Sequence, residues 1–226
     1  MTLTLYVHPL ASFCHKVLIA LYENDVPFRA VTVDFGDPDS AAEVFAHWPV
    51  GKIPVLHDRE PDRHLAETSI IIEYLQARHP GPLRLLPDAE ELRLDARLWD
   101  RFFDLYVSQP MQKIVTDRIR PEGSADPFGV DEARGMLDTA YAMIERRMAG
   151  RTWACGDDFT IADCAAAPGL FFASIVHPFA VDQENLAAYL QRLLARPSMQ
   201  RVLAEARPFF SLFPYRDAMP PQYLEG

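Results

Sequence analysis

The sequence has few cysteines, few basic side chains and no long apolar run. The three cysteines, Cys14, Cys155 and Cys164, lack CxxC or metal-ligand spacing, so neither a disulfide framework nor a bound metal is expected. No stretch reaches the roughly 18 apolar residues of a membrane-spanning helix. Residues 3–7 form too short an apolar start for a secretory signal. These absences predict a cytoplasmic protein that does not contact a membrane.

Acidic side chains outnumber basic ones, 32 to 22, and the net charge of −10 is divided equally between residues 1–80 and 81–226. Neither part therefore offers a basic face for nucleic acid or an anionic membrane. A chain of 226 residues that is 49% hydrophobic can bury one large core or two smaller ones. The composition thus excludes nucleic-acid binding and predicts an ordinary globular protein.

The first eighty residues alternate between strand and helix patterns. Residues 3–7 and 28–33 are predicted as buried strands, and the apolar spacing of residues 17–22 after Ser12 indicates a helix between them. A strand, a helix and a strand in about thirty residues form a βαβ unit with a parallel pair. The next elements are a helix at 40–47, strands at 54–57 and near 64–66, and a helix at 67–79, whose core-facing residues include Ile70. This order is that of a thioredoxin-like α/β domain, residues 1–80.

A group of helix breakers, His79-Pro80-Gly81-Pro82 and Pro87, marks residues 81–88 as a linker. Beyond it only helical spacing appears, which predicts an all-α helical bundle over residues 89–226. Helices are expected near residues 88–118, 130–149, 161–176, 185–195 and 197–206. The tail from Arg207 is rich in aromatic residues and proline, and should pack back onto the body.

Thr160-x-x-Asp163 stands directly before an apolar helix and has the spacing of a capping box. In a capping box each of the two residues satisfies a backbone amide at the helix start. We interpret the pair as a stabilising element of the helical domain without a part in catalysis.

The stretch Val50-Gly51-Lys52-Ile53-Pro54-Val55-Leu56 places a proline within an apolar run. Proline cannot donate a ladder hydrogen bond, so Pro54 is expected at the first residue of a strand, where a cis Ile53–Pro54 bond is one option. The amide and carbonyl of Ile53 would then lie outside the sheet. Such free groups are suited to pairing with another peptide.

Three motifs, in this order, resemble the cytosolic glutathione transferases. They are Gly51-Lys52-Ile53-Pro54-Val55-Leu56, Glu67-Thr68-Ser69-Ile70-Ile71-Ile72-Glu73-Tyr74-Leu75 and Gly156-Asp157-Asp158-Phe159-Thr160-Ile161-Ala162-Asp163. The resemblance covers nearly the whole chain. It implies a homodimer that uses glutathione as co-substrate, with one glutathione site per subunit built mainly from residues 1–80.

The resemblance also implies which residues hold glutathione. The backbone of Ile53 before a cis Pro54 would pair with the cysteinyl part, and Lys52 would reach the glycine carboxylate. Thr68 and the helix-start amides would receive the γ-glutamyl carboxylate, while Glu67 pairs with the ammonium group. The alternatives are structural: a strand-start Pro54, a solvated Lys52, and a Glu67-Thr68 pair that only begins a helix.

The family activates the glutathione thiol with a Tyr, Ser or Cys near the first helix, and Ser12 is the candidate here. A two-unit fall in a thiol pKa requires about 2.7 kcal/mol. One hydroxyl hydrogen bond to the sulfur supplies about 1.5–3 kcal/mol and a helix N-terminus about 0.3–2 kcal/mol. Counting back from Asp25-Val26 puts the family's serine position at Ala11, whereas counting forward from Pro9 favours Ser12. A role for Ser12 as helix cap alone also stays open.

Other readings of the first helix lead to other functions. Cys14, if exposed in the first turn, would give glutathione-dependent thiol oxidoreductase chemistry, whereas a buried Cys14 would not. His15 and Lys16 are expected at the surface or facing a second subunit. The family's maleylacetoacetate isomerases are less favoured, because their Ser-Ser-Cys run is absent. A non-catalytic glutathione-binding scaffold is the alternative outside the enzymes.

The electrophile is expected to bind between the two domains, where ligand sites are common. Leu10, Phe103, Tyr106 and Tyr215 are its candidate walls, with Val107, Met111, Phe210 and Phe213 nearby in the pattern. An aromatic stripe at helical spacing is equally consistent with core packing. The leading hypothesis is a glutathione transferase whose bound thiol attacks a small apolar electrophile.

Overall fold

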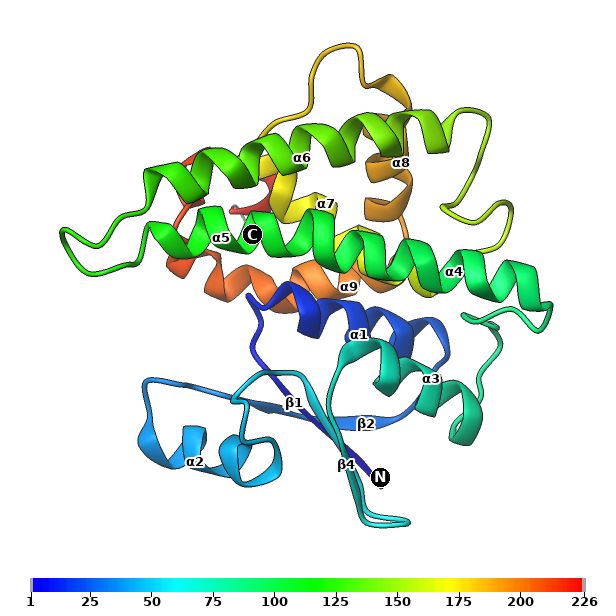
Figure 1. Cartoon of the computed structure of the whole chain (residues 1–226). Helices are drawn as coiled ribbons and strands as arrows, with labels where there is room; N and C mark the ends of the chain where they lie inside the picture. Colours follow the sequence, from blue (N-terminus) through cyan, green and yellow to red (C-terminus); the bar gives the residue numbers. More distant parts are fainter. Residues whose placement is uncertain (1, 225–226) are drawn as a thin grey trace.

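The structure, a computed structural model, describes residues 2–224 and consists of a small α/β layer beneath a bundle of helices (Figure 1). The sheet contains β1 (Leu3–Val7), β2 (Phe28–Thr32), β3 (Val55–Asp58) and β4 (Arg63–Leu65) in the order β2-β1-β3-β4. β1 and β2 are parallel, and β3 runs antiparallel to β1 and β4. The predicted βαβ unit and hairpin are therefore confirmed.

Helices cover both faces of this sheet. α1 (Ser12–Glu23) and α3 (Thr68–Arg78) lie between the sheet and the bundle, while α2 (Pro38–His47) lies on the opposite side (Figure 1). The prediction that Ile70 faces the core is wrong, because 52% of its surface is exposed on α3.

The second half of the chain is helical, as predicted. Its elements are α4 (Glu90–Phe102), the π-helical segment η1 (Phe103–Ser108), α5 (Gln109–Asp117), α6 (Pro127–Met148), α7 (Ile161–Val176), α8 (Glu184–Leu194) and α9 (Pro197–Ala206). The short 3₁₀ turns η2 (Arg207–Leu212), η3 (Arg216–Ala218) and η4 (Pro221–Tyr223) follow. α7 is buried along nearly its whole length, which is typical of a helix that is apolar on all sides.

The aromatic tail packs onto α7, as its composition predicts. The rings of Phe172 and Phe213 lie 5.3 Å apart between centroids, and those of Phe171 and Tyr223 lie 5.1 Å apart. The tail thereby covers apolar surface of α7. Within residues 2–224, no helix has the length and apolar content needed to cross a bilayer.

The capping box at the start of α7 is present, and Asp163 is its fully buried member. The carboxylate accepts hydrogen bonds from the amides of Thr160 and Ala154, both at 2.9 Å, and from the Tyr189 hydroxyl at 2.6 Å. Burial raises the pKa of Asp163, and these hydrogen bonds oppose that effect. One side chain thus joins α7, the preceding loop and α8.

Replacing Asp163 by Ala is expected to lower the free energy of unfolding by at least about 3 kcal/mol, because it removes a helix cap and leaves buried donors without acceptors. Urea denaturation followed by circular dichroism measures the loss. The exposed Asp158, five residues earlier, provides the matched control: Asp158→Ala should change stability by about 0.5 kcal/mol or less. Equal losses in the two variants would contradict this role.

Lys16 is buried at the contact between the two domains, and its predicted surface position is wrong. Its ammonium lies 2.6 Å from a carboxylate oxygen of Asp100 and 2.7 Å from one of Asp104, and its side chain is 1% exposed. The Ser69 hydroxyl donates to Asp100 at 2.5 Å, and Arg101 donates to Asp104 at 3.0 Å. This group, the Lys16 cluster, joins α1, α3, α4 and η1. The sequence conceals it because its members are far apart along the chain.

His15 is buried as well, contrary to the predicted surface position. Its Nε2 donates to the carbonyl oxygen of Pro9 at 2.6 Å, and its ring stacks at a tilt on Phe172. Burial lowers the pKa of His15 to about 4, so the ring stays neutral at pH 7. His15 therefore fixes the loop before α1 against α7.

Candidate active site

A cavity of about 720 Å³ lies between the α/β layer and the helices α4 and α5. The α/β layer contributes His8, Leu10, Ala11, Phe13, Phe35, Trp48, Gly51, Lys52, Ile53, Pro54, Ala66, Glu67 and Thr68. The helical side contributes Arg101, Asp104, Gln109, Gln112, Thr116 and Ile119. The structure therefore brings all five predicted glutathione-binding residues, from Lys52 to Thr68, to one cavity between the domains.

The segment before β3 presents free backbone groups to this cavity. The Ile53–Pro54 peptide is cis, and β3 begins only at Val55. Among the described residues, the amide and carbonyl of Ile53 form no hydrogen bond. The preceding Gly51 has φ of 68°, and a Cβ there would lie 2.3 Å from the ring of Phe45, so this turn requires glycine.

The start of α3 forms another part of the cavity wall. Glu67 has φ of 66° in the left-handed region, and its side chain does not cap the helix. Thr68 is the first residue of α3 and is 7% exposed, and its hydroxyl has no partner among the described residues. The first amides of α3 are therefore open to an anion, which the positive end of a helix attracts.

The start of α1 is open in the same way. Ala11 occupies the N-cap position and provides no side-chain oxygen, so nothing from the cap competes for the first amides. Ala11 lines the cavity, but Ser12 does not. Ser12 is 3% exposed, and its buried hydroxyl has no hydrogen-bond partner within residues 2–224. The structure thus places Ala11 where Ser12 was expected, because side chains one residue apart on a helix face different directions.

Cys14 lies one turn into α1 and is fully buried, away from the cavity. Burial raises the pKa of its thiol to about 12, against a smaller opposing hydrogen bond from the backbone of His8. A thiol in that state is neutral at physiological pH and a poor nucleophile.

The native protein is therefore expected to leave Cys14 unmodified by iodoacetamide at pH 7.5 on a timescale that fully alkylates a free thiol, as judged by peptide mass spectrometry. The partly buried Cys155 is compared in the same digest. Burial raises the pKa of its thiol to about 12 too, so it should also react slowly in the native protein. Unfolding in urea should expose both thiols. Rapid alkylation of Cys14 in the native state would instead support the thiol oxidoreductase alternative.

Of the four predicted electrophile walls, Leu10 lines the cavity and the others do not. Phe103 is fully buried in the helical core, and Tyr106 is 44% exposed. The ring of Tyr215 is covered by the guanidinium of Arg118, whose central carbon lies 3.6 Å from the ring centroid. The helix that carries Phe103 and Tyr106 contains the π-helical segment η1, which the sequence pattern does not reveal. Its wider turn shifts the cavity-facing positions from the α-helical series, so the face continues from Asp104 to Gln109.

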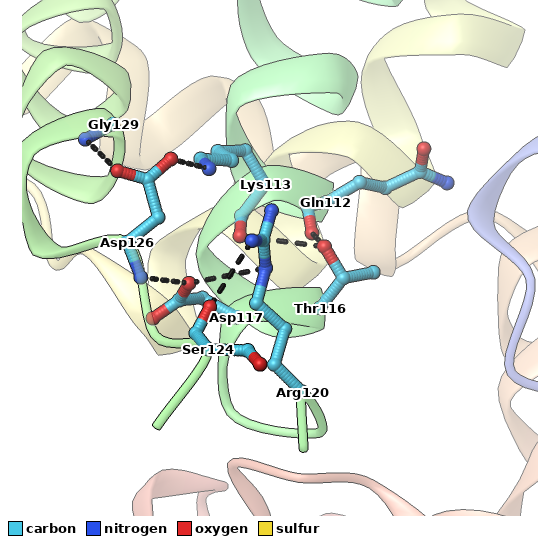
Figure 2. A network of polar contacts seen from close by, with 8 residues as sticks. All are labelled: Gln112, Lys113, Thr116, Asp117, Arg120, Ser124, Asp126 and Gly129. Carbon is cyan, nitrogen blue, oxygen red and sulfur yellow. Dashed lines mark hydrogen bonds and ion pairs between the residues drawn. The ribbon is translucent and has the colours of Figure 1, made fainter. Parts of the chain in front are cut away.

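A polar network fixes the far end of α5 and the loop to α6 (Figure 2). Asp126 pairs with Lys113 and accepts the amide of Gly129, while its own amide donates to Asp117 at 2.9 Å. The side chain of Gln112 extends away from this network (Figure 2), and Gln112 lines the cavity. The network thus joins α5, which carries polar residues of the cavity wall, to the start of α6.

Several residues that line the cavity were not predicted from the sequence. His8 precedes a proline and resembles a loop residue, while Arg101, Asp104, Gln109 and Gln112 resemble the solvated face of a helix. Polar residues at helical spacing look the same in a sequence whether they face a cavity or bulk solvent. Their common position follows only from the tertiary fold, in which α4 and α5 pack against α7 and face the α/β layer across the cavity.

Two family profiles match the chain: glutathione S-transferase, N-terminal domain, over residues 5–83, and glutathione S-transferase, C-terminal domain, over residues 112–197. A glutathione S-transferase of Methylobacterium radiotolerans, solved in complex with glutathione sulfonate, is 30% identical, with a TM-score of 0.77 over 88% of this chain and 93% of that one. The chain belongs to the glutathione S-transferase family. Its predicted family and fold are thereby confirmed.

Further relatives agree with this assignment. Glutathione S-transferase GstB of Escherichia coli (strain K12) is 29% identical over 191 residues, which cover 83% of this transferase and 91% of that protein. A glutathione S-transferase structure from Rhodospirillum rubrum F11 is 25% identical, with a TM-score of 0.81 over 99% of this chain and 98% of that one.

Among residues 2–224, no set of three or more His, Cys, Asp or Glu side chains is arranged to hold a metal ion.

Proposed function

We propose that this transferase binds glutathione in the cavity and activates its thiol for attack on a small electrophile. The observation that carries the proposal is the meeting of three open backbone sites in one cavity: Ile53 before β3, the start of α3 and the start of α1. An extended tripeptide with an anionic end needs such donors and acceptors.

Each part of glutathione has a partner in the proposal. The cysteinyl amide and carbonyl pair with the backbone of Ile53, and the exposed Lys52 reaches the glycine carboxylate. The γ-glutamyl carboxylate binds the Thr68 hydroxyl and the amides of α3, while Glu67 pairs with the ammonium group. With these contacts in place, the thiol of glutathione points toward the start of α1.

The electrophile would bind beside the thiol, between Leu10 and Phe13 of the α/β layer and Gln109 and Gln112 of α5. This space has apolar and amide-bearing sides, so it suits a small electrophile with a hydrogen-bonding group. Ser12 and Cys14 stay as sequence predictions for the sulfur contact. Each would need the start of α1 to turn its side chain toward the cavity.

Calorimetric titration with glutathione and turnover with a panel of aryl halides, isothiocyanates and enones test the function. We expect saturable binding and conjugation of at least one electrophile. Binding without any turnover would favour the scaffold alternative. Reduction of mixed disulfides, lost in Cys14→Ser, would favour the oxidoreductase alternative.

A cytoplasmic homodimer completes the proposal. α3 and α4 lie side by side, joined by an ion pair of 2.6 Å between Glu73 and Arg97. Their outer side exposes Ile70, Leu94 and Leu98, each by more than half, and the family resemblance implies that a second copy covers such residues. Light scattering should give twice the mass of the 25.6 kDa chain, and Leu98→Asp should shift it toward the monomer.

A further inference from the structure

His8 lines the cavity from the loop that joins β1 to α1. This loop and the first turn of α1 contribute His8, Leu10, Ala11 and Phe13 to the cavity wall. Among these four side chains only the imidazole of His8 can form a hydrogen bond. A side-chain donor to a sulfur at the start of α1 is therefore available from this segment at His8.

The structure fixes the ring of His8 and its tautomer. Nδ1 accepts a hydrogen bond from the amide of Leu10 at 3.2 Å, and the carbonyl oxygen of His8 accepts the amide of Ala11 at 2.9 Å. Since Nδ1 is an acceptor, a neutral ring carries its proton on Nε2. Burial lowers the pKa of His8, against the opposing charge of Asp34, so the ring is neutral at pH 7.

We propose that His8 stabilises the glutathione thiolate by donating its Nε2–H to the sulfur, next to the open amides of α1. The inference rests on the proposed function, since it names a residue for that same site. The thiol proton passes to solvent and His8 keeps its own, so His8 acts as a donor and not as a base. Hydrogen bonds to a charged acceptor are about twice as strong as neutral ones, which favours thiolate over thiol.

Two substitutions separate the donor from the loop contact. His8→Asn can retain an acceptor near the position of Nδ1 but is too short to place a donor at that of Nε2, whereas His8→Gln can place its amide there. His177→Asn is the matched control, because His177 lies beyond the C-terminal end of α7, pairs with Asp138 and does not line the cavity.

The pKa of the bound thiol, followed by thiolate absorbance in the ultraviolet, is the decisive measurement. We expect His8→Asn to raise it by about one to two units relative to the wild type, His8→Gln to recover part of the shift, and His177→Asn to leave it unchanged. The affinity for S-methylglutathione, which has no ionisable thiol, should stay within about threefold in all three variants.

Other outcomes would overturn the inference. An unchanged thiol pKa in His8→Asn, or a rise in Ser12→Ala without one in His8→Asn, would assign the donor elsewhere. An equal loss of affinity for glutathione and S-methylglutathione in His8→Asn would make His8 a positioning residue of the loop. Failure of the wild-type protein to bind S-methylglutathione would overturn the proposed function together with the inference.

Discussion

Replacing Thr68 by Val is expected to weaken glutathione binding by about 10- to 150-fold, measured by isothermal titration calorimetry. The reason is the loss of one hydrogen bond to a carboxylate, about 1.5–3 kcal/mol, at the open start of α3. Valine has nearly the volume of threonine, so the packing at this 7%-exposed position is kept. The effect should therefore fall on binding rather than on folding.

Thr68→Ser is the matched control, since it keeps the hydroxyl and loses only a methyl group. It should bind glutathione within about threefold of the wild type. Glu67→Gln should weaken glutathione more than a glutathione analogue that lacks the amino group. If Thr68→Val binds glutathione as well as the wild type does, the γ-glutamyl carboxylate is not held at the start of α3.

Replacing Lys16 by Met is expected to lower the free energy of unfolding by about 3–5 kcal/mol, because it leaves the buried carboxylate of Asp100 without a cation and that of Asp104 with only the half-exposed Arg101. Urea denaturation at pH 7.5 measures the loss. Lys113→Met is the control, since the pair of Lys113 with Asp126 is exposed to solvent and should contribute far less to stability. Losses of the same size in both variants would contradict the role of burial.

The deficit of Lys16→Met should also depend on pH. Burial raises the pKa of Asp104, against the opposing charge of Lys16, so removing Lys16 raises that pKa further. The folded variant then holds a proton that the unfolded chain releases above pH 4, and its stability falls as pH rises through the folded pKa. The deficit should therefore be smaller at pH 5 than at pH 8, by circular dichroism melts. A deficit independent of pH would mean that Asp104 does not take up the proton.

Local sequence patterns predicted most of the fold because most helices and strands of this chain have the residue pattern and the end signals typical of their type. β1 matches the expected residues 3–7, and α7 and α9 match residues 161–176 and 197–206. These segments have a clear apolar pattern and clear ends, such as the capping box at Thr160. The helix expected at 88–118 is different, because the π-helical segment η1, which packs against α7, separates α4 from α5.

The binding side of the candidate site was visible in the sequence, because its residues lie in two short motifs whose backbone makes the contacts. Lys52, Ile53 and Pro54 share one turn, and Glu67 and Thr68 share one helix start. The residues on the helical side could not be predicted in this way. Phe103 was expected on the cavity and lies in the core, while Gln112 looked solvated and lines the cavity.

The sequence by itself determined the family, the order of the elements and the residues proposed to bind glutathione, because short-range spacing encodes all three. Only the tertiary structure decided which side chain at the start of α1 faces the cavity. Successive side chains on a helix point in directions that differ by about 100°. Ser12 therefore points into the interior, while Ala11 lines the cavity. It also decided that Lys16 lies between the domains, since only folding brings Asp100 and Asp104 to α1.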